Sequence, residues 1–242
     1  MNEHTVGGRD TETPGAAEVA DRLRAAPADI DALRGRLAAD AAREGLVDVV
    51  YRVVDSPIGG LLLAATPAGL AYVAFEAENS SEVLGMLADR IGPRLLRDTD
   101  TRDATVAAAG TKSETGLTGL TGLTGPTPAG ILDEADAQIS QYLAGDRREF
   151  DLPLDTRLAT GFRGQVQRHL ADIAYGRTAT YGQLAADLDR PGAVRAVGTA
   201  CATNPLPLVW PCHRVLRSDG GLGGYRGGVE AKQRLLAIEQ AA

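Results

Sequence analysis

The residues with the clearest capacity for chemistry are a cysteine and a histidine that follow one another, Cys212 and His213. A thiol with a pKa near roughly 8.5 is mostly protonated at neutral pH, so a nucleophilic cysteine needs a base or a positive charge close by. His213 is the obvious base, and Arg214 adds positive charge. We therefore predict that Cys212 is a nucleophile, although an unpaired cysteine is more often a packed structural residue.

The segment that leads to Cys212 is rich in proline. Pro205, Pro207 and Pro211 exclude a helix and predict a stiff, extended approach to the thiol. Adjacent residues on an extended chain point to opposite sides, so His213 needs a sharp local turn or a bridging water to reach the sulfur. A third group should orient the imidazole, and the residues alone do not favour Glu239 over Glu230 for that role.

The other cysteine and histidines do not indicate a disulfide or a metal site. Two cysteines in 242 residues argue against a disulfide-built secreted domain, and we interpret Cys201 as a thiol packed in a helix. No Cys/His cluster has the spacing of a structural zinc site, so we expect no metal and no cofactor. The chain has no apolar run of roughly 18 residues and no apolar signal core near its start, so we expect a cytoplasmic protein without membrane contact.

The elements that must position the thiol begin with a small α/β domain, expected over residues 46–154. Residues 1–45 precede it as a partly helical extension. The domain is expected to contain a flexible loop over 100–130, where the triplet Gly-Leu-Thr occurs three times. Its regular elements are predicted from apolar periodicity and turn residues: strands over 47–54, 61–65 and 70–75, helices over 81–91 and 133–143, and a linking or strand segment over 147–154.

The predicted catalytic domain, residues 155–242, is mostly helical. A helix is expected over 161–174, and two shorter helices over 181–188 and 193–203 are separated by Arg-Pro-Gly. This pattern is typical of a helix-turn-helix, although helical hairpins without a DNA role are common. The expected fold class is therefore α/β (α+β): a small N-terminal domain with a β-hairpin sheet, followed by a winged-helix-like domain that carries the cysteine.

Charge is segregated along the chain. The formal net charge is -7, which alone would argue against a nucleic-acid partner. From Arg157 to the end, however, eleven Lys and Arg face six Asp and Glu, a balance of +5, whereas residues 1–156 carry -12. We predict that the C-terminal third faces DNA.

Several segments resemble the O6-alkylguanine-DNA alkyltransferases, also called methylated-DNA-protein-cysteine methyltransferases. The resemblance is strongest from about Gly161 to Glu239 and weaker from Val47 to Leu154. It is carried by Tyr175-Gly-Arg-Thr-Ala-Thr-Tyr181, Arg195-Ala-Val-Gly198, Asn204-Pro205, Pro211-Cys-His-Arg-Val215 and Gly223-Gly-Tyr-Arg-Gly-Gly228. This resemblance implies a DNA repair protein that takes an alkyl group from O6-alkylguanine, and from O4-alkylthymine, irreversibly and once per molecule.

The resemblance also implies roles at the acceptor. Cys212 would receive the alkyl group, His213 would deprotonate it through a water, Glu239 would orient His213, and Asn204 would brace the turn around the site. Because O6 lies inside the base stack, the base must leave the helix before a protein thiol can reach it.

Further residues are implied to bind DNA or to line the base pocket. Arg195 would insert into the duplex and Tyr181 would assist rotation of the base and then donate to it. The other implied contacts to DNA are Thr180, Ala196 and Gly198, and the other implied pocket residues are Val215, Tyr225, Arg226 and Trp210. Trp210 and Arg226 depart from the smaller residues common in the family, so we expect a narrowed pocket that prefers methyl to bulky adducts.

Other functions remain open at this point. A lesion-sensing relative would bind without transfer, but such relatives lack the acceptor cysteine. A transcription regulator would bind undamaged promoter DNA, and a thiol hydrolase would turn over. The expected partner is double-stranded DNA that contains O6-alkylguanine, and a monomer is expected because one lesion needs one acceptor.

Overall fold

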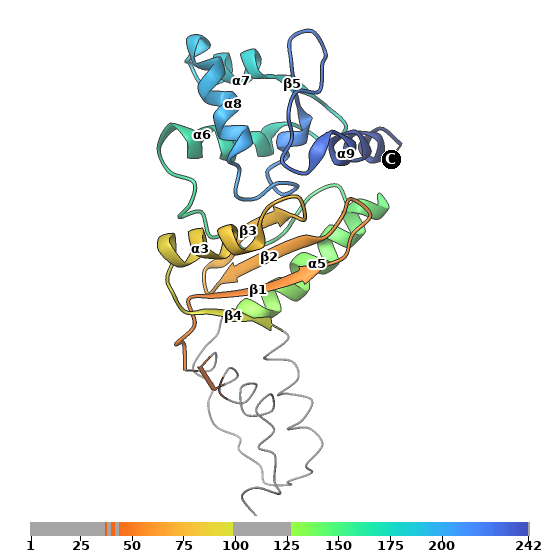
Figure 1. Ribbon diagram of the computed structural model, residues 1–242. Coiled ribbons are helices and arrows are strands. Elements are labelled where there is room, and N and C mark those ends of the chain that lie inside the picture. The colour runs from red at the N-terminus through yellow and green to blue at the C-terminus, as the bar shows by residue number, and fades with distance from the viewer. Residues whose placement is uncertain (1–36, 38–39, 42–43, 99–126, 242) are drawn as a thin grey trace, which may run out of the picture.

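The structure is a computed structural model that describes residues 37, 40–41, 44–98 and 127–241. A sheet-containing unit and a mostly helical unit lie against each other, with the C-terminal helix beside the boundary between them (Figure 1). The α/β fold class expected from the sequence is confirmed. The expected N-terminal extension, residues 1–45, and the Gly-Leu-Thr repeat lie outside the described residues, apart from a few positions of the former.

A four-stranded sheet forms the first unit. The hairpin predicted from its turn residues is present, and a short fourth strand that the sequence did not reveal runs parallel to the first. The order across the sheet is β3-β2-β1-β4, with β1–β2 and β2–β3 antiparallel. The strands are β1 (Val49–Val54), β2 (Leu61–Thr66), β3 (Gly69–Phe75) and β4 (Leu95–Arg97).

Two helices cover the sheet, α3 (Ser80–Arg90) and α5 (Pro128–Ala144). Alternate residues of β2 face opposite sides, so Leu61 and Leu63 pack in the cluster that contains α5, while Leu62 packs in the cluster that contains α3. The predicted start of α5 at residue 133 was wrong by more than a turn. Pro128, expected in a loop, occupies the first helical turn after the N-cap Thr127, where a missing N–H costs nothing.

The second unit begins with α6 (Gly161–His169), which is shorter than the predicted helix 161–174 because its end tightens into a 3-10 turn, Leu170–Asp172. The two predicted short helices are α7 (Tyr181–Asp187) and α8 (Val194–Ala202), separated by a 3-10 turn over Pro191–Ala193. The last helix is α9 (Gly228–Ala241). Strands β5 (Ala179–Thr180) and β6 (Val215–Leu216) pair in parallel between these helices.

The start of α7 is fixed by a capping box. The Thr180 hydroxyl accepts from the Gln183 N–H at 3.1 Å, and the Gln183 side chain accepts from the Thr180 N–H at 2.7 Å. Each side chain therefore satisfies a backbone donor that the first helical turn leaves unpaired. This bond orients α7, and with it Tyr181 at the first position of the helix.

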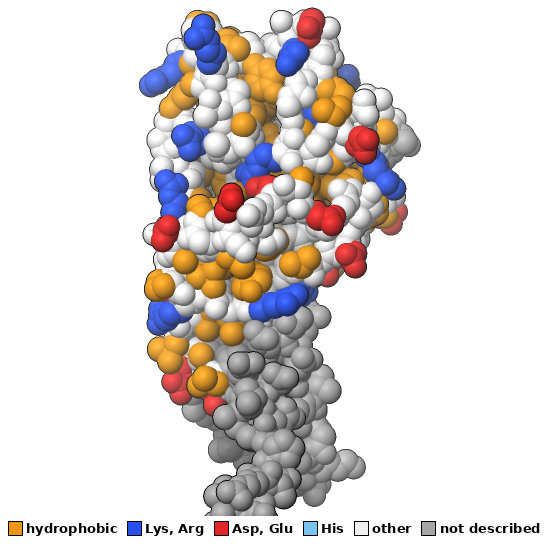
Figure 2. Space-filling model, in the orientation of Figure 1, with side chains coloured by type: hydrophobic (Ala, Val, Ile, Leu, Met, Phe, Trp, Pro, Cys, Tyr) orange, Lys and Arg blue, Asp and Glu red, His pale blue; other side chains and the backbone are white. Residues whose placement is uncertain are grey.

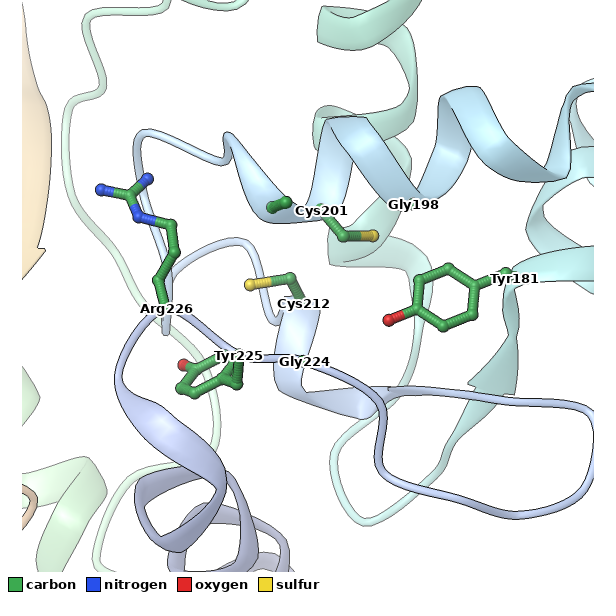
Figure 3. Close-up of a pocket in the computed structure, with 8 residues that line it drawn as sticks. Tyr181, Gly198, Cys201, Cys212, Gly224, Tyr225 and Arg226 are labelled. Atoms are coloured by element: carbon green, nitrogen blue, oxygen red, sulfur yellow. The ribbon is translucent and has the colours of Figure 1, made fainter.

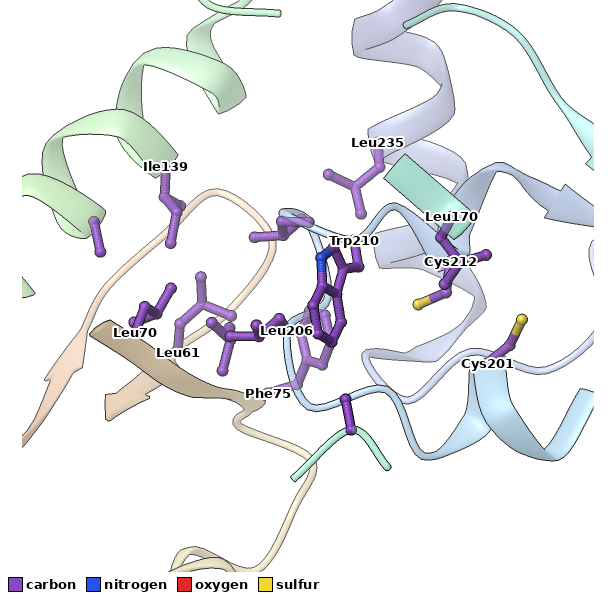
Figure 4. Packing of buried hydrophobic residues seen from close by; sticks show 14 of the residues in the cluster. Leu61, Leu70, Phe75, Ile139, Leu170, Cys201, Leu206, Trp210, Cys212 and Leu235 are labelled. Carbon is purple, nitrogen blue, oxygen red and sulfur yellow. The ribbon is translucent and has the colours of Figure 1, made fainter. Parts of the chain in front are cut away.

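One apolar cluster runs without interruption from the sheet into the helical unit. It joins Leu61, Leu70 and Phe75 of the sheet to Ile139 of α5, and continues through Leu206 and Trp210 to Cys212 and Leu235, as Figure 4 shows. The fully buried N–H of Val73 also donates to the Pro205 carbonyl at 2.8 Å, so the edge of the sheet holds the proline-rich segment. The thiol therefore lies at the end of a core that both units share. Among the described residues, no helix is long and apolar enough to cross a membrane.

Candidate active site

A closed loop holds the chain before the thiol. Asn204 is fully buried, its side-chain nitrogen donates to the Trp210 carbonyl at 2.7 Å, and its side-chain oxygen accepts from the Leu206 N–H at 3.0 Å. Leu208, inside the loop, has φ of +74°, a left-handed conformation that costs energy for a residue with a Cβ. The bracing expected of Asn204 is therefore present in the geometry of the loop.

The turn expected after the prolines is a 3-10 turn, Cys212–Arg214. The Cys212 N–H donates to the Trp210 carbonyl at 2.8 Å, and the Arg214 N–H donates to the Pro211 carbonyl at 3.0 Å. The chain is therefore no longer extended at the thiol, and the side chains of Cys212 and His213 need not point to opposite sides. Both residues are buried.

The His213 ring has one partnered and one unpartnered nitrogen. Its Nε2 lies 2.6 Å from Oε1 of Glu239, a carboxylate that can only accept, so Nε2 carries the proton. Its Nδ1 is buried and has no hydrogen-bond partner among the described residues. The geometry therefore leaves Nδ1 as an unoccupied proton acceptor, and it selects Glu239, not Glu230, as the group that contacts the imidazole.

Glu239 accepts several hydrogen bonds besides that of His213. The Arg214 Nε donates to both carboxylate oxygens at 3.0 Å, the Gly176 N–H donates to Oε2 at 2.9 Å, and the hydroxyl of Tyr142 donates to Oε1. Although burial opposes the charge, these donors hold the pKa of Glu239 at about 2, below its ordinary 4.5. Neither Tyr142 nor Arg214 was predicted to contact Glu239, and 97 residues separate Tyr142 from Glu239 in the chain.

Burial determines the resting charge of the Cys-His pair. It raises the pKa of the Cys212 thiol, against the opposing effects of the Asn204 side chain and the positive charges of Arg226 and Lys232. It also lowers the pKa of His213, against the favourable charge of Glu239. The resting pair is consequently a neutral thiol beside a neutral imidazole, so the thiol must lose its proton during the reaction.

A cavity of about 340 Å³ opens at Cys212, between α8 and the loop that precedes α9 (Figure 3). The Tyr181 hydroxyl points into it, toward Cys212. Its lining residues are Tyr181, Gly198, Cys201, Ala202, Cys212, Gly224, Tyr225 and Arg226. The cavity thus brings together Cys212, Tyr181, Gly198, Tyr225 and Arg226, which the sequence analysis had assigned to the site.

Two residues expected in the pocket lie elsewhere. Trp210 is 4% exposed and packs in the shared core, behind the thiol, and Val215 is fully buried in β6. Neither lines the cavity at Cys212. The expectation that Trp210 narrows this pocket is therefore wrong, because the indole is the apolar group that joins the two halves of the core.

Arg226 forms a link between the two units. Its guanidinium donates to the Asn204 carbonyl at 2.7 Å and to the Tyr72 hydroxyl at 2.5 Å, and it also pairs with the Glu78 carboxylate. Beside it, a Cβ on Gly227 would lie 2.6 Å from the Phe75 ring, so only glycine permits this approach. Arg226 therefore borders the cavity with its stem while its head is tethered to the sheet.

Cys201 lines the cavity as well as packing in α8. Figure 3 shows its sulfur pointing toward Tyr181 and not toward the sulfur of Cys212. Burial raises its pKa to about 12, so it stays a thiol at neutral pH. The interpretation as a packed helix thiol is correct for its burial, but its place beside the cavity was not predicted.

The face of α8 that leads away from the cavity is exposed. Arg195 and Ala196 lie at its solvent side, and Gly198 lies between that side and the cavity. In Figure 2, Lys and Arg side chains gather over the end of the molecule formed by α6, α7 and α8. The described residues contain no group of three or more His, Cys, Asp or Glu side chains that could hold a metal ion.

The chain has clear similarity to known proteins. The family model described as "6-O-methylguanine DNA methyltransferase, DNA binding domain" matches residues 161–241. A methylated-DNA–protein-cysteine methyltransferase from Mycobacterium bovis is 42% identical over 191 residues, which cover 79% of this chain and 92% of the relative. One from Mycolicibacterium paratuberculosis is 48% identical over 103 residues, which cover 43% of this chain and 62% of the relative.

A solved structure shows the same similarity in three dimensions. The Mycobacterium tuberculosis OGT in complex with DNA superposes with a TM-score of 0.59 at 33% identity, covering 79% of this chain and 93% of that one. The similarity therefore extends over the sheet unit as well as the helical unit.

Proposed function

The chain belongs to the family of methylated-DNA–protein-cysteine methyltransferases, whose activity is DNA repair by alkyl transfer, and we propose that the acceptor in this member is the thiol of Cys212. The observation that carries the proposal is the unpartnered Nδ1 of His213. Cys201 and Cys212 both line the cavity, but only Cys212 has a basic side chain, His213, next to it in the chain. The substrate is O6-alkylguanine in duplex DNA, and O4-alkylthymine is a second substrate.

The reaction balances with the groups present. The Cys212 sulfur loses its proton to Nδ1 of His213 through a water and attacks the alkyl carbon, forming an S–C bond as the C–O6 bond breaks. The electron pair of the broken bond stays with guanine, which takes a proton from water at the base edge, where Tyr181 supplies a hydrogen bond. His213 then returns the thiol proton to water, so charge and protons balance. The thioether that remains has no easy leaving group, so each molecule acts once.

The cavity supports entry of a single flipped base. Its floor is the thiol, and its walls are Gly198 of α8 and Tyr225 of the opposite loop. A base within a duplex cannot reach this depth, so extrusion is required. We assign Arg195 to the gap left in the duplex, with Thr180 and Ala196 beside it, since α7 and α8 present these residues at the exposed end of the helical unit. In this proposal, residues 155–242 form the catalytic, DNA-binding domain.

Intact-protein mass spectrometry tests the acceptor. After incubation with a duplex that contains one O6-methylguanine, the protein should gain one methyl group, mapped to Cys212, and Cys212→Ser should gain none. Cys201→Ser is the matched control and should gain one methyl group like the unaltered chain. Protein that binds the lesion without gaining mass would instead indicate a lesion-sensing module, and more than one product per molecule would indicate a turnover enzyme.

The same proposal includes a monomer as the acting unit, because one lesion consumes one thiol. This proposal is supported if the complex has the mass of one chain plus one duplex and each chain gains one methyl group.

A further inference from the structure

His213, Arg214 and Glu239 of the helical unit form a polar cluster beside Cys212, and a residue from the sheet unit completes it. Tyr142 lies near the end of α5, is fully buried, and reaches across to the cluster that contains His213 and Glu239. Its hydroxyl donates to Oε1 of Glu239 and lies 3.1 Å from Nε2 of His213. One hydroxyl therefore contacts both the His213 imidazole and the Glu239 carboxylate that orients this imidazole.

The protons of this cluster fix the direction of each bond. Glu239 accepts only, so the single proton of the Tyr142 hydroxyl goes to Glu239. The hydroxyl oxygen then faces the Nε2–H of His213 with its lone pairs, as a second acceptor beside Oε1. A neutral phenol is required for this arrangement, and burial together with the Glu239 charge raises the pKa of Tyr142 far above its ordinary value. The cluster is consistent only with a proton on Nε2 and a free Nδ1.

We propose that Tyr142 is a positioning residue for alkyl transfer: its hydroxyl holds the His213 ring and shares the charge of Glu239, so that His213 stays an uncharged base with Nδ1 free to accept a proton. This inference rests on the proposed role of Cys212 and His213. It makes the sheet unit part of the chemistry, although Tyr142 does not touch the cavity.

The surroundings of the ring leave it little freedom. Phe150 packs against Tyr142 with centroids 5.1 Å apart, and Tyr175 packs edge-on with centroids 5.9 Å apart. The hydroxyl of Tyr175 is buried but has no hydrogen-bond partner among the described residues. Both hydroxyls are thus buried, although Tyr175 as a whole is only half-buried, and only the Tyr142 hydroxyl contacts Glu239.

The charge of His213 depends on every titratable group that faces it. Glu239 and Lys232 approach from α9, Arg214 from its own 3-10 turn, Tyr142 from α5, and the Tyr225 ring from the loop before α9, with Cys212 next in the chain. Arg214 and Lys232 oppose an imidazolium, whereas Glu239 favours one. The donor from Tyr142 weakens that single favourable effect, because it disperses the charge on Oε1.

The test compares Tyr142→Phe with Tyr175→Phe. The measurement is the rate constant for a single methyl transfer from an O6-methylguanine duplex across pH 5 to 9, with duplex affinity measured in parallel. In Tyr142→Phe the lost donor leaves more charge on Glu239, so the pKa of His213 rises. We expect the rate constant at neutral pH to fall about tenfold, which is part of what a well-placed general base contributes. The acidic limb of the plot of rate against pH should move up by about one pH unit. Tyr175→Phe should leave rate and limb unchanged, and duplex affinity should be unchanged in both variants.

A second substitution keeps the test decisive if Tyr142→Phe does not fold. Incorporation of 3,5-difluorotyrosine at position 142 preserves the ring and makes the hydroxyl a stronger donor, so the acidic limb should move to lower pH. An acidic limb that stays in place in either folded variant overturns the proposal, as does an equal slowing in Tyr175→Phe. If the unaltered protein transfers no methyl group at all, the role of Cys212 fails instead, so the two failures are distinguishable.

Discussion

At the scale of the residue, the buried carboxylate of Glu239 links the site to stability. Its pKa is about 2 in the folded chain and near 4.5 when unfolded, so its ionisation stabilises the fold above pH 4.5, and this contribution is lost as the pH falls toward 2. The lowered pKa of His213 acts in the same direction, since a buried neutral imidazole is disfavoured once the pH falls below about 6.5.

We therefore expect Glu239→Gln to lower the free energy of unfolding at pH 7 by about 3 kcal/mol and to flatten its pH dependence between about pH 4.5 and 2. Chemical denaturation at a series of pH values measures both effects. Glu230→Gln, in the exposed first turn of the same helix, is the control and should behave like the unaltered chain. Equal behaviour of the two variants would contradict the assignment of Glu239.

A second residue-scale prediction concerns the brace at Asn204. Asn204→Ala leaves the Leu206 N–H buried without a partner and leaves the Trp210 carbonyl with only its bond from the Cys212 N–H, which should cost about 2 kcal/mol of unfolding free energy and slow methyl transfer. Gln167→Ala is the matched control, because that buried amide also makes two hydrogen bonds to the backbone, here to the carbonyls of Ala200 and Thr203, which precede the loop to Cys212. Both variants should lose stability, but only Asn204→Ala should lose transfer rate per folded molecule; equal slowing in both would show that the brace has no specific role.

At the scale of the element, replacing a glycine with alanine should raise the stability in one helix and lower it in another. In an ordinary helix interior, Gly→Ala stabilises by about 0.5–1 kcal/mol. Gly85 of α3 is exposed with open space around its missing Cβ, so Gly85→Ala should raise the melting temperature. A Cβ on Gly164 of α6 would lie 2.1 Å from the Ala159 carbonyl oxygen, so Gly164→Ala should lower it. Calorimetry of the two variants checks the pair, and a gain in both would mean that the start of α6 can shift.

The elements also show how far the sequence predicts the structure. The hairpin β2–β3 and the helices α7 and α8 were predictable because apolar periodicity and local turn residues determine them. The three-residue strand β4 was not, since it exists only through its pairing with β1. The proline-rich approach predicted a stiff loop but not the closure by Asn204, which depends on a bond across six residues.

The site was predictable to the same extent. Cys212 and His213 stand together in the chain, and the resemblance supplied Glu239. Tyr142 was a buried position at the end of an amphipathic helix, and a buried tyrosine indicates that its hydroxyl has a partner without saying which one. Trp210 was misplaced because sequence spacing does not tell whether a side chain points into a cavity or into the core behind it.

At the scale of the whole molecule, the sheet unit and the helical unit share an apolar core, polar links and the cluster around Glu239. Trp210 joins the apolar halves, Arg226 ties the cavity loop to Tyr72 and Glu78, and Tyr142 reaches Glu239. The position of the thiol therefore depends on both units, and a substitution at their boundary should change the geometry of the site.

The segregation of charge along the chain leads to a prediction about how the chain binds DNA. Arg217 is exposed and lies beside Gly223, near the hydroxyl of Tyr181, which lines the cavity. We therefore expect Arg217 to meet a phosphate of the strand whose base enters the cavity. Each phosphate that the protein neutralises steepens the dependence of log affinity on log salt by about 0.9. Arg217→Ala should therefore make that slope shallower by about one and weaken binding to damaged and undamaged duplexes alike.

Arg90, at the exposed end of α3 in the acidic, sheet-containing part of the chain, supplies the comparison. Arg90→Ala removes the same charge from the whole molecule, so an effect of net charge alone would change both variants equally. If the helical unit binds the duplex through its own basic side chains, fluorescence anisotropy over a salt series should show a reduced slope for Arg217→Ala and an unchanged slope for Arg90→Ala. Equal slopes in both variants would mean that the phosphates do not contact Arg217, and would contradict the proposed path of the flipped base past this residue.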